Sequence, residues 1–191
     1  MIEIIDRHLA LRNPRFRCMD VDRTTPLVVA LRHVRGDPAT DEQLAALKEL
    51  AGPAYEALVP MYRAFDGLVL HMNGDEAGLI VGAIELLEEF NHSWQAWHSD
   101  LDPSELFEFQ KHGFAFATVA GSGNYFILHE GRVYYSDHDG GDDEPWADDL
   151  ESFFVRALSD PVRFLDDAGC HTRYSDGETD AQYIPEHFEH D

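Results

Sequence analysis

The chain has 191 residues, of which 44% are hydrophobic and 12% aromatic, a composition that supplies a packed core and excludes disorder of the whole chain. Its 14 Lys and Arg residues stand against 37 Asp and Glu residues, which gives a net charge of −23. A field of that sign repels nucleic-acid phosphates and anionic membranes, so nucleic-acid and membrane binding are disfavoured. Charge alone leaves open whether the acidity attracts a basic partner or only confers solubility or suits a salt-rich habitat.

The first third of the chain is expected to be helical. Pro26 follows Thr24-Thr25 at a first-turn position, which favours a helix beginning there. Thr40 and Gln43 have the spacing of a capping box, the clearest helix start in the chain. Apolar residues at helical spacing predict helices over residues 2–11, 26–34, 40–50 and 55–65.

The middle of the chain changes to the alternation and turn chemistry of strands. Asn73-Gly74 is a strong hairpin signal, and Gly121-Ser122-Gly123 and Glu130-Gly131 are short enough to join consecutive strands. Strands are therefore expected over residues 68–72, 78–81, 114–119, 124–129 and 132–137. Helices are expected over residues 83–97, near residues 150–158 and over residues 161–169, with Trp94 and Trp97 in the core.

This order of elements predicts an α+β fold in which N-terminal helices pack on a mainly antiparallel sheet. The expected division is an N-terminal helical extension over residues 1–36, one α+β domain over residues 37–169 and an acidic C-terminal tail over residues 170–191. No stretch approaches the roughly 20 apolar residues of a membrane span, and the N-terminus lacks the apolar centre of a signal peptide. Cys18 and Cys170 are accordingly expected to be reduced, buried thiols of a cytoplasmic protein.

The sequence lacks the motifs of common catalytic classes. It contains no Gly-x-Ser-x-Gly elbow, no phosphate-binding lysine loop and no His-Glu-x-x-His. Residues 137–144 miss the register of a calcium loop, because glycine stands at a ligand position. Eleven histidines invite a metal hypothesis, but the neighbouring pairs have unconvincing ligand spacing, so surface or capping roles are expected. Those pairs are His92 and His98, His129 and His138, and His187 and His190. We expect no metal, no cofactor and no enzymatic activity.

One segment concentrates the negative charge. Asp137–Glu151 contains eight acidic residues and no Lys or Arg, so its carboxylates repel one another unless they are solvated or met by cations. A solvated loop without a function and a docking surface for a basic protein are both consistent with this pattern. Trp146 would give a docking surface an aromatic anchor. The predicted partner-binding residues are Asp137, Asp139, Asp142, Asp143, Glu144, Trp146, Asp148 and Asp149.

The strand region resembles the SUKH superfamily, which includes yeast cell-wall assembly regulators and many bacterial immunity proteins. The resemblance is carried by residues 113–117 (GFAFA), 121–128 (GSGNYFIL) and 131–139 (GRVYYSDHD), followed by the helix around Phe153-Phe154. Upstream, residues 58–67 (LVPMYRAFDG) resemble the family's helix and its following turn, although Asp-Gly stands where Asn-Gly is commoner. The match covers about residues 41–167.

The resemblance implies a non-catalytic α+β module. Bacterial members typically neutralise a co-encoded toxin, often a nuclease, by binding it, and such toxins tend to be basic. The expected function is therefore stoichiometric binding of a basic toxin as an immunity protein. Two alternatives stay open: a regulatory scaffold or adaptor without a toxin partner, and a metal-dependent enzyme.

Overall fold

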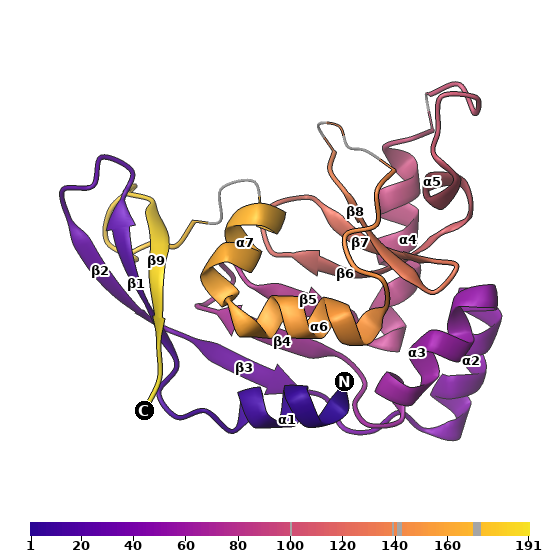
Figure 1. The fold of residues 1–191 in the computed structure, drawn as a ribbon, viewed down its shortest axis with the longest axis horizontal. Helices are drawn as coiled ribbons and strands as arrows, with labels where there is room; N and C mark the ends of the chain where they lie inside the picture. Colours follow the sequence, from indigo (N-terminus) through magenta and orange to yellow (C-terminus); the bar gives the residue numbers. More distant parts are fainter. Residues whose placement is uncertain (100, 139, 141–142, 170–172) are drawn as a thin grey trace.

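The computed structural model describes residues 1–191 except 100, 139, 141–142 and 170–172 (Figure 1). Helices and antiparallel sheets share one chain, which confirms the predicted α+β class. No helix in the described part of the chain is long and apolar enough to cross a membrane.

The larger sheet has six strands in the order β3-β4-β5-β6-β7-β8, each antiparallel to its neighbours. Five of the six were predicted. Asn73-Gly74 joins β4 to β5 as expected, with Gly74 at a positive φ of 59° that the turn requires. The strands are β3 (Arg32–Arg35), β4 (Leu68–Met72), β5 (Leu79–Val81), β6 (Phe114–Val119), β7 (Tyr125–His129) and β8 (Arg132–Ser136).

Helices cover both faces of this sheet (Figure 1). On one face, Phe116 and Phe126 contact Phe153 of α6, with ring centroids 5.3 and 4.8 Å apart. On the other face, Ala115 and Ile127 pack in a separate cluster with Trp94 of α4 and Phe109 of α5. The helices are α1 (Ile2–Leu9), α2 (Asp41–Ala51), α3 (Tyr55–Tyr62), α4 (Ile84–Ala96), α5 (Glu108–His112), α6 (Leu150–Ser159) and α7 (Pro161–Gly169), with a 3-10 turn, η1 (Gly52–Ala54), before α3.

The prediction of a helical extension is wrong beyond α1. Residues 26–34 form strand β2 (Pro26–Ala30) and most of β3, joined by Leu31, and not a helix. Val29 is buried and Val28 is 60% exposed, the period of two that a strand has. The first-turn preference of Pro26 is weaker than the β preference of the valines and the pairing available to them.

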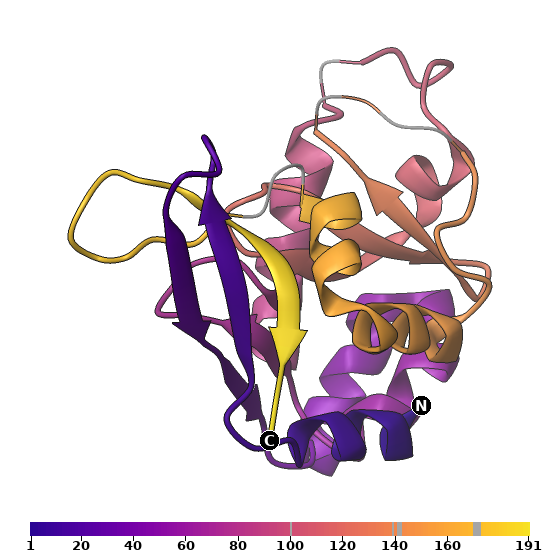
Figure 2. The same cartoon turned by 60° about the vertical axis from the view of Figure 1, so that its left-hand side comes forward.

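A second, three-stranded sheet, β2-β1-β9, joins the two ends of the chain (Figure 2). Neither β1 (Arg15–Asp20) nor β9 (Tyr183–Glu189) was predicted, and β9 gives the acidic tail an ordered strand. Glu189 accepts from the Arg15 guanidinium at 3.0 Å and also pairs with Arg17. The arginine-rich beginning of the chain therefore meets its acidic end.

Of the two tryptophans predicted to lie in the core, the structure confirms one. Trp94 is fully buried, as expected, and its indole N–H donates to Ser136 Oγ at 2.9 Å. Trp97 is 36% exposed rather than in the core, because it follows the last residue of α4. Cys18 is a buried free thiol, and burial raises its pKa to about 12; Cys170 lies outside the described residues.

Candidate functional site

The predicted acidic segment runs from β8 to the start of α6. Asp139 and Asp142 lie outside the described residues. Asp137 is partly buried, whereas the other described acids of the predicted site are exposed. These exposed acids are Asp143, Glu144, Asp148 and Asp149.

Two residues of the predicted docking site have roles within the fold. Asp149 is the N-cap of α6: its carboxylate accepts from the Ser152 backbone N–H at 2.7 Å, which holds the pKa of Asp149 below its ordinary value. Trp146 is half-buried and packs on Phe126 and Phe164, with both ring centroids 5.2 Å away. The Arg156 guanidinium lies 3.5 Å from the Trp146 ring centre. Both residues thus stabilise the chain itself.

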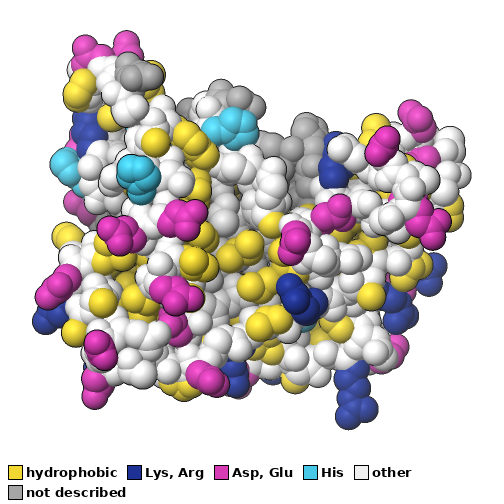
Figure 3. All heavy atoms as spheres, turned by 180° about the vertical axis from the view of Figure 1, so that it is seen from behind, with side chains coloured by type: hydrophobic (Ala, Val, Ile, Leu, Met, Phe, Trp, Pro, Cys, Tyr) yellow, Lys and Arg dark blue, Asp and Glu magenta, His cyan; other side chains and the backbone are white. Residues whose placement is uncertain are grey.

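A larger acidic feature lies on the α2 and α4 side of the molecule. A groove of about 1070 Å³ opens between the end of α2, helix α4 and the β7–β8 turn, and a smaller hollow of about 640 Å³ continues it between α2 and α4. Leu50, Glu85 and Glu88 line both. Figure 3 shows this face, with acidic side chains and histidines around exposed apolar surface.

The groove has an acidic rim and an apolar floor. Of the residues that the structure describes, none of those lining it is Lys or Arg. Such a lining favours a cationic occupant, and the floor offers it apolar contact. The rim acids are Glu42, Glu49, Glu85, Glu88, Glu89 and Glu130, with His92, His112 and His129, and the floor includes Leu50, Ala51, Pro53, Ala57, Phe114 and Leu128.

A single carboxylate holds the two helices of the groove side by side. Asp66 accepts from the Gln43 side-chain amide at 2.6 Å and from the Ile84 backbone N–H at 2.7 Å. Gln43 lies in the first turn of α2, where Thr40 forms the predicted capping box with it, and Ile84 begins α4. The position of the groove therefore depends on the Asp66-Gly67 turn, one of the features on which the SUKH resemblance rests.

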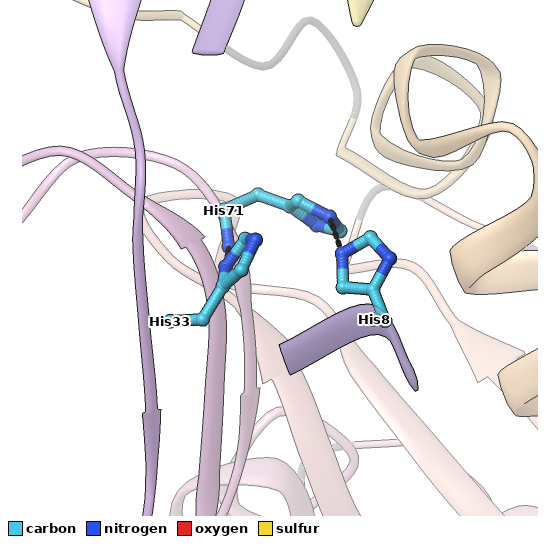
Figure 4. Close-up of side chains that lie close together, drawn as sticks. All are labelled: His8, His33 and His71. Carbon is cyan, nitrogen blue, oxygen red and sulfur yellow. Dashed lines mark hydrogen bonds between the residues drawn. The ribbon is translucent and has the colours of Figure 1, made fainter. Parts of the chain in front are cut away.

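A second candidate site is a cluster of three histidines from three elements (Figure 4). His8 comes from the last turn of α1, His33 from β3 and His71 from β4. The two Nε2 atoms of His8 and His71 lie 2.9 Å apart in a hydrogen bond, and the His71 backbone N–H donates to His33 Nδ1 at 3.0 Å. Among the described residues, no other group of His, Cys, Asp and Glu has this proximity.

The backbone around the cluster is irregular. The register of β3 with β4 shifts between Arg32 and Val34, at His33. His71 has φ of +59°, an uncommon conformation for a residue other than glycine, and the Tyr174 hydroxyl fixes it by donating to the His71 carbonyl at 2.6 Å. Strand irregularities and strained residues of this kind are enriched at functional sites.

Burial disfavours the protonated, charged form of all three rings. It lowers the pKa of His8 from 6.5 to about 4, with smaller effects of His33 and His190, and it holds the pKa of His71 well below its ordinary value. The pKa of His33 is lowered for the same reason. Neutral imidazole is the state that binds metal ions.

The sequence predicted none of these three histidines as a site. The positions are 25 and 38 residues apart, so no local spacing pattern connects them. The available signal was a polar residue within an apolar pattern: His8 shares the inner face of α1 with Ile5, and His71 lies between Leu70 and Met72 in a predicted strand.

Comparison with models of known protein families and with curated proteins finds no match for this chain. The SUKH resemblance thus stays a prediction from the residues and motifs.

Proposed function

We propose that this chain is a protein-binding module whose acidic groove takes a basic protein, and that the partner is a toxin of the kind that bacterial SUKH proteins neutralise. The observation that carries the proposal is the groove lining: six glutamates around an apolar floor, with no Lys or Arg among the described lining residues. The toxin partner rests in addition on the resemblance in the strand region.

The charge and the floor of the groove would contribute differently to binding. The glutamates raise the local concentration of a basic partner and speed association. Contacts on the floor, with Leu50 at 38% exposure at the junction of the two hollows, slow dissociation by burying apolar surface.

The groove supports docking better than the acidic segment alone, because the fold itself uses Trp146 and Asp149. The beginning of the segment contacts the C-terminal end of α4, because the ring of His138 lies 5.8 Å from that of Trp97, which directly follows this helix.

The test is binding kinetics with the product of the gene adjacent to the one that encodes this chain. The Glu85→Gln/Glu88→Gln variant should associate on the order of tenfold more slowly at low salt, and the difference should shrink at about 150 mM salt. In an assay of the partner's activity, inhibition should be complete when one molecule of this chain is present for each molecule of the partner.

A matched control removes two exposed glutamates elsewhere, Glu3→Gln/Glu178→Gln, and should leave association near the wild-type rate. Equal slowing by both variants would show that only net charge matters, and a partner that does not bind would refute the proposal. A larger effect of Asp143→Asn/Glu144→Gln than of the groove variant would place docking on the acidic segment instead.

A further inference from the structure

The three histidine rings have the mutual arrangement of a metal centre. Their ring centroids lie 4.9 Å (His8 to His33), 5.0 Å (His8 to His71) and 4.9 Å (His33 to His71) apart. Three imidazoles that each bind a tetrahedral zinc ion through one nitrogen at 2.0–2.1 Å have centroids about 5 Å apart. Figure 4 shows the rings turned toward one another, and their ligand atoms lie within 4.8 Å of one another. Small ring movements suffice to bring all three to one ion.

Two ring nitrogens of the cluster take part in no hydrogen bond within the described part of the chain. Among the described residues, His33 Nε2 and His71 Nδ1 have no hydrogen-bond partner although both atoms are buried. Buried polar groups in native proteins almost always have partners, so a ligand that uses these two nitrogens would satisfy both. His71 is fully buried, so its unpaired nitrogen does not face bulk solvent.

The surroundings of the cluster favour a soft or borderline cation over a hard one. The rings of Phe16 and Phe188 lie 5.8 Å from the ring of His71, and Phe188 stacks on His8. Imidazole in an apolar shell suits zinc, copper or nickel, whereas calcium and magnesium require oxygen ligands. The described residues place no carboxylate in the group.

We propose that His8, His33 and His71 bind one divalent ion of the zinc type, with the fourth coordination position open to water. Three protein ligands and one open position are the arrangement of accessible zinc sites, and half-buried His33 gives the ion its route of entry. The ion would bind His33 through Nε2 and His71 through Nδ1, the two nitrogens without partners, and His8 through Nε2, which would then no longer share a hydrogen bond with His71 Nε2. It also moves the His33 proton from Nε2 to Nδ1, which breaks the bond from the His71 backbone N–H.

The site would tie three elements together, because each ligand comes from a different one. The ion would fasten α1 to the edge of the six-stranded sheet at β3 and β4. This inference is independent of the groove: no residue of the cluster lines it.

The test uses the full chain after chelator treatment and dialysis, with Zn²⁺ and Co²⁺ as probes. Isothermal titration should give one Zn²⁺ per chain with micromolar or tighter affinity. Co²⁺ should show the intense visible absorption of a tetrahedral centre rather than the weak bands of the hydrated ion. His33→Gln should weaken Zn²⁺ binding by more than about 100-fold, since the loss of an outer-shell partner alone costs 10–100-fold.

His187→Gln is the matched control, an exposed histidine on the neighbouring strand β9 that should keep wild-type affinity. Circular dichroism confirms folding of each variant, and His8→Gln replaces His33→Gln if the latter does not fold. A folded wild-type chain that does not bind Zn²⁺ at micromolar concentration would overturn the proposal. So would binding that both ligand variants retain.

Discussion

The Asn91 side chain joins helix α4 to strand β6 with hydrogen bonds at both ends of its amide. Its Nδ2 donates to the carbonyls of Leu87 at 2.8 Å and Ala115 at 2.9 Å, and its Oδ1 accepts from the Ala115 backbone N–H at 2.8 Å. Because the protein itself supplies hydrogen-bond partners for both ends of this buried amide, the fold alone explains why Asn91 is there. His33 and His71 differ, because each keeps a buried ring nitrogen without a partner among the described residues. This contrast distinguishes a structural polar group from a candidate ligand.

Trp146 allows a test of the sequence-based docking hypothesis at a single residue. Its indole packs on Phe126, Phe153 and Phe164 and beneath the Arg156 guanidinium. Trp146→Ala should therefore lower the free energy of unfolding by about 3 kcal/mol, the lower end for loss of a large aromatic side chain, because the ring is half-buried. Urea denaturation followed by circular dichroism measures it.

Trp97→Ala is the control for the Trp146 experiment. Trp97 is 36% exposed and its truncation should cost less, about 1 kcal/mol. If Trp146→Ala instead leaves stability unchanged and shortens the residence time of a bound partner, Trp146 is an interface anchor, as the sequence predicted.

At the scale of elements, strands β1 and β9 join residues about 170 positions apart. Arg15 and Arg17 on β1 both pair with Glu189 on β9, and Arg23 pairs with Glu186 at 3.2 Å. The excess of arginine in residues 1–36 thus has partners within the chain, and these arginines are less available for an external ligand than the sequence alone suggests.

What the sequence predicted about the elements depended on local signals. The capping box at Thr40, the Asn73-Gly74 turn and the helical stripe of α4 each lie within one element, and all three were predicted. Strands β1, β2 and β9 lack a turn signal as clear as Asn73-Gly74, and β9 pairs with a strand more than 160 residues away, so its pairing cannot be found from local sequence. The same reason hid the histidine cluster, whose three members are neighbours only after β3 pairs with β4 and α1 packs beneath them.

Charge reversal at Glu189 tests the pairing of β9 with β1. Glu189→Arg places a third cation beside Arg15 and Arg17 and should destabilise the chain by about 1 kcal/mol, since the Glu189 side chain is only 19% exposed. Arg15→Glu in the same chain should recover part of that loss. A double-mutant cycle by chemical denaturation measures the coupling, and additive effects would show that the two side chains do not interact in solution.

At the scale of the whole molecule, the charges are unevenly compensated. Residues 1–36 hold seven arginines and four acids, whereas residues 37–191 hold seven cations and 33 acids. Several arginines of the first segment pair with the tail, so the compensation of the 33 acids of residues 37–191 rests largely on their own seven cations. The groove lies in this part of the chain, so the charge that would attract a partner also repels itself in the free protein.

Added salt should therefore stabilise the free protein but slow its association with a basic partner. Raising the ionic strength from about 10 mM to 150 mM shortens the screening length from about 30 Å to 8 Å, which reduces the self-repulsion of a chain with a net charge of −23. We expect a gain on the order of 1 kcal/mol, seen as a rise in Tm of about 2–4 °C, while association with a basic partner slows. Choline chloride should raise the Tm as much as sodium chloride, because screening does not depend on the identity of the cation. A rise with sodium alone would indicate specific cation binding, and an unchanged Tm would mean that counterions already neutralise the groove at low salt.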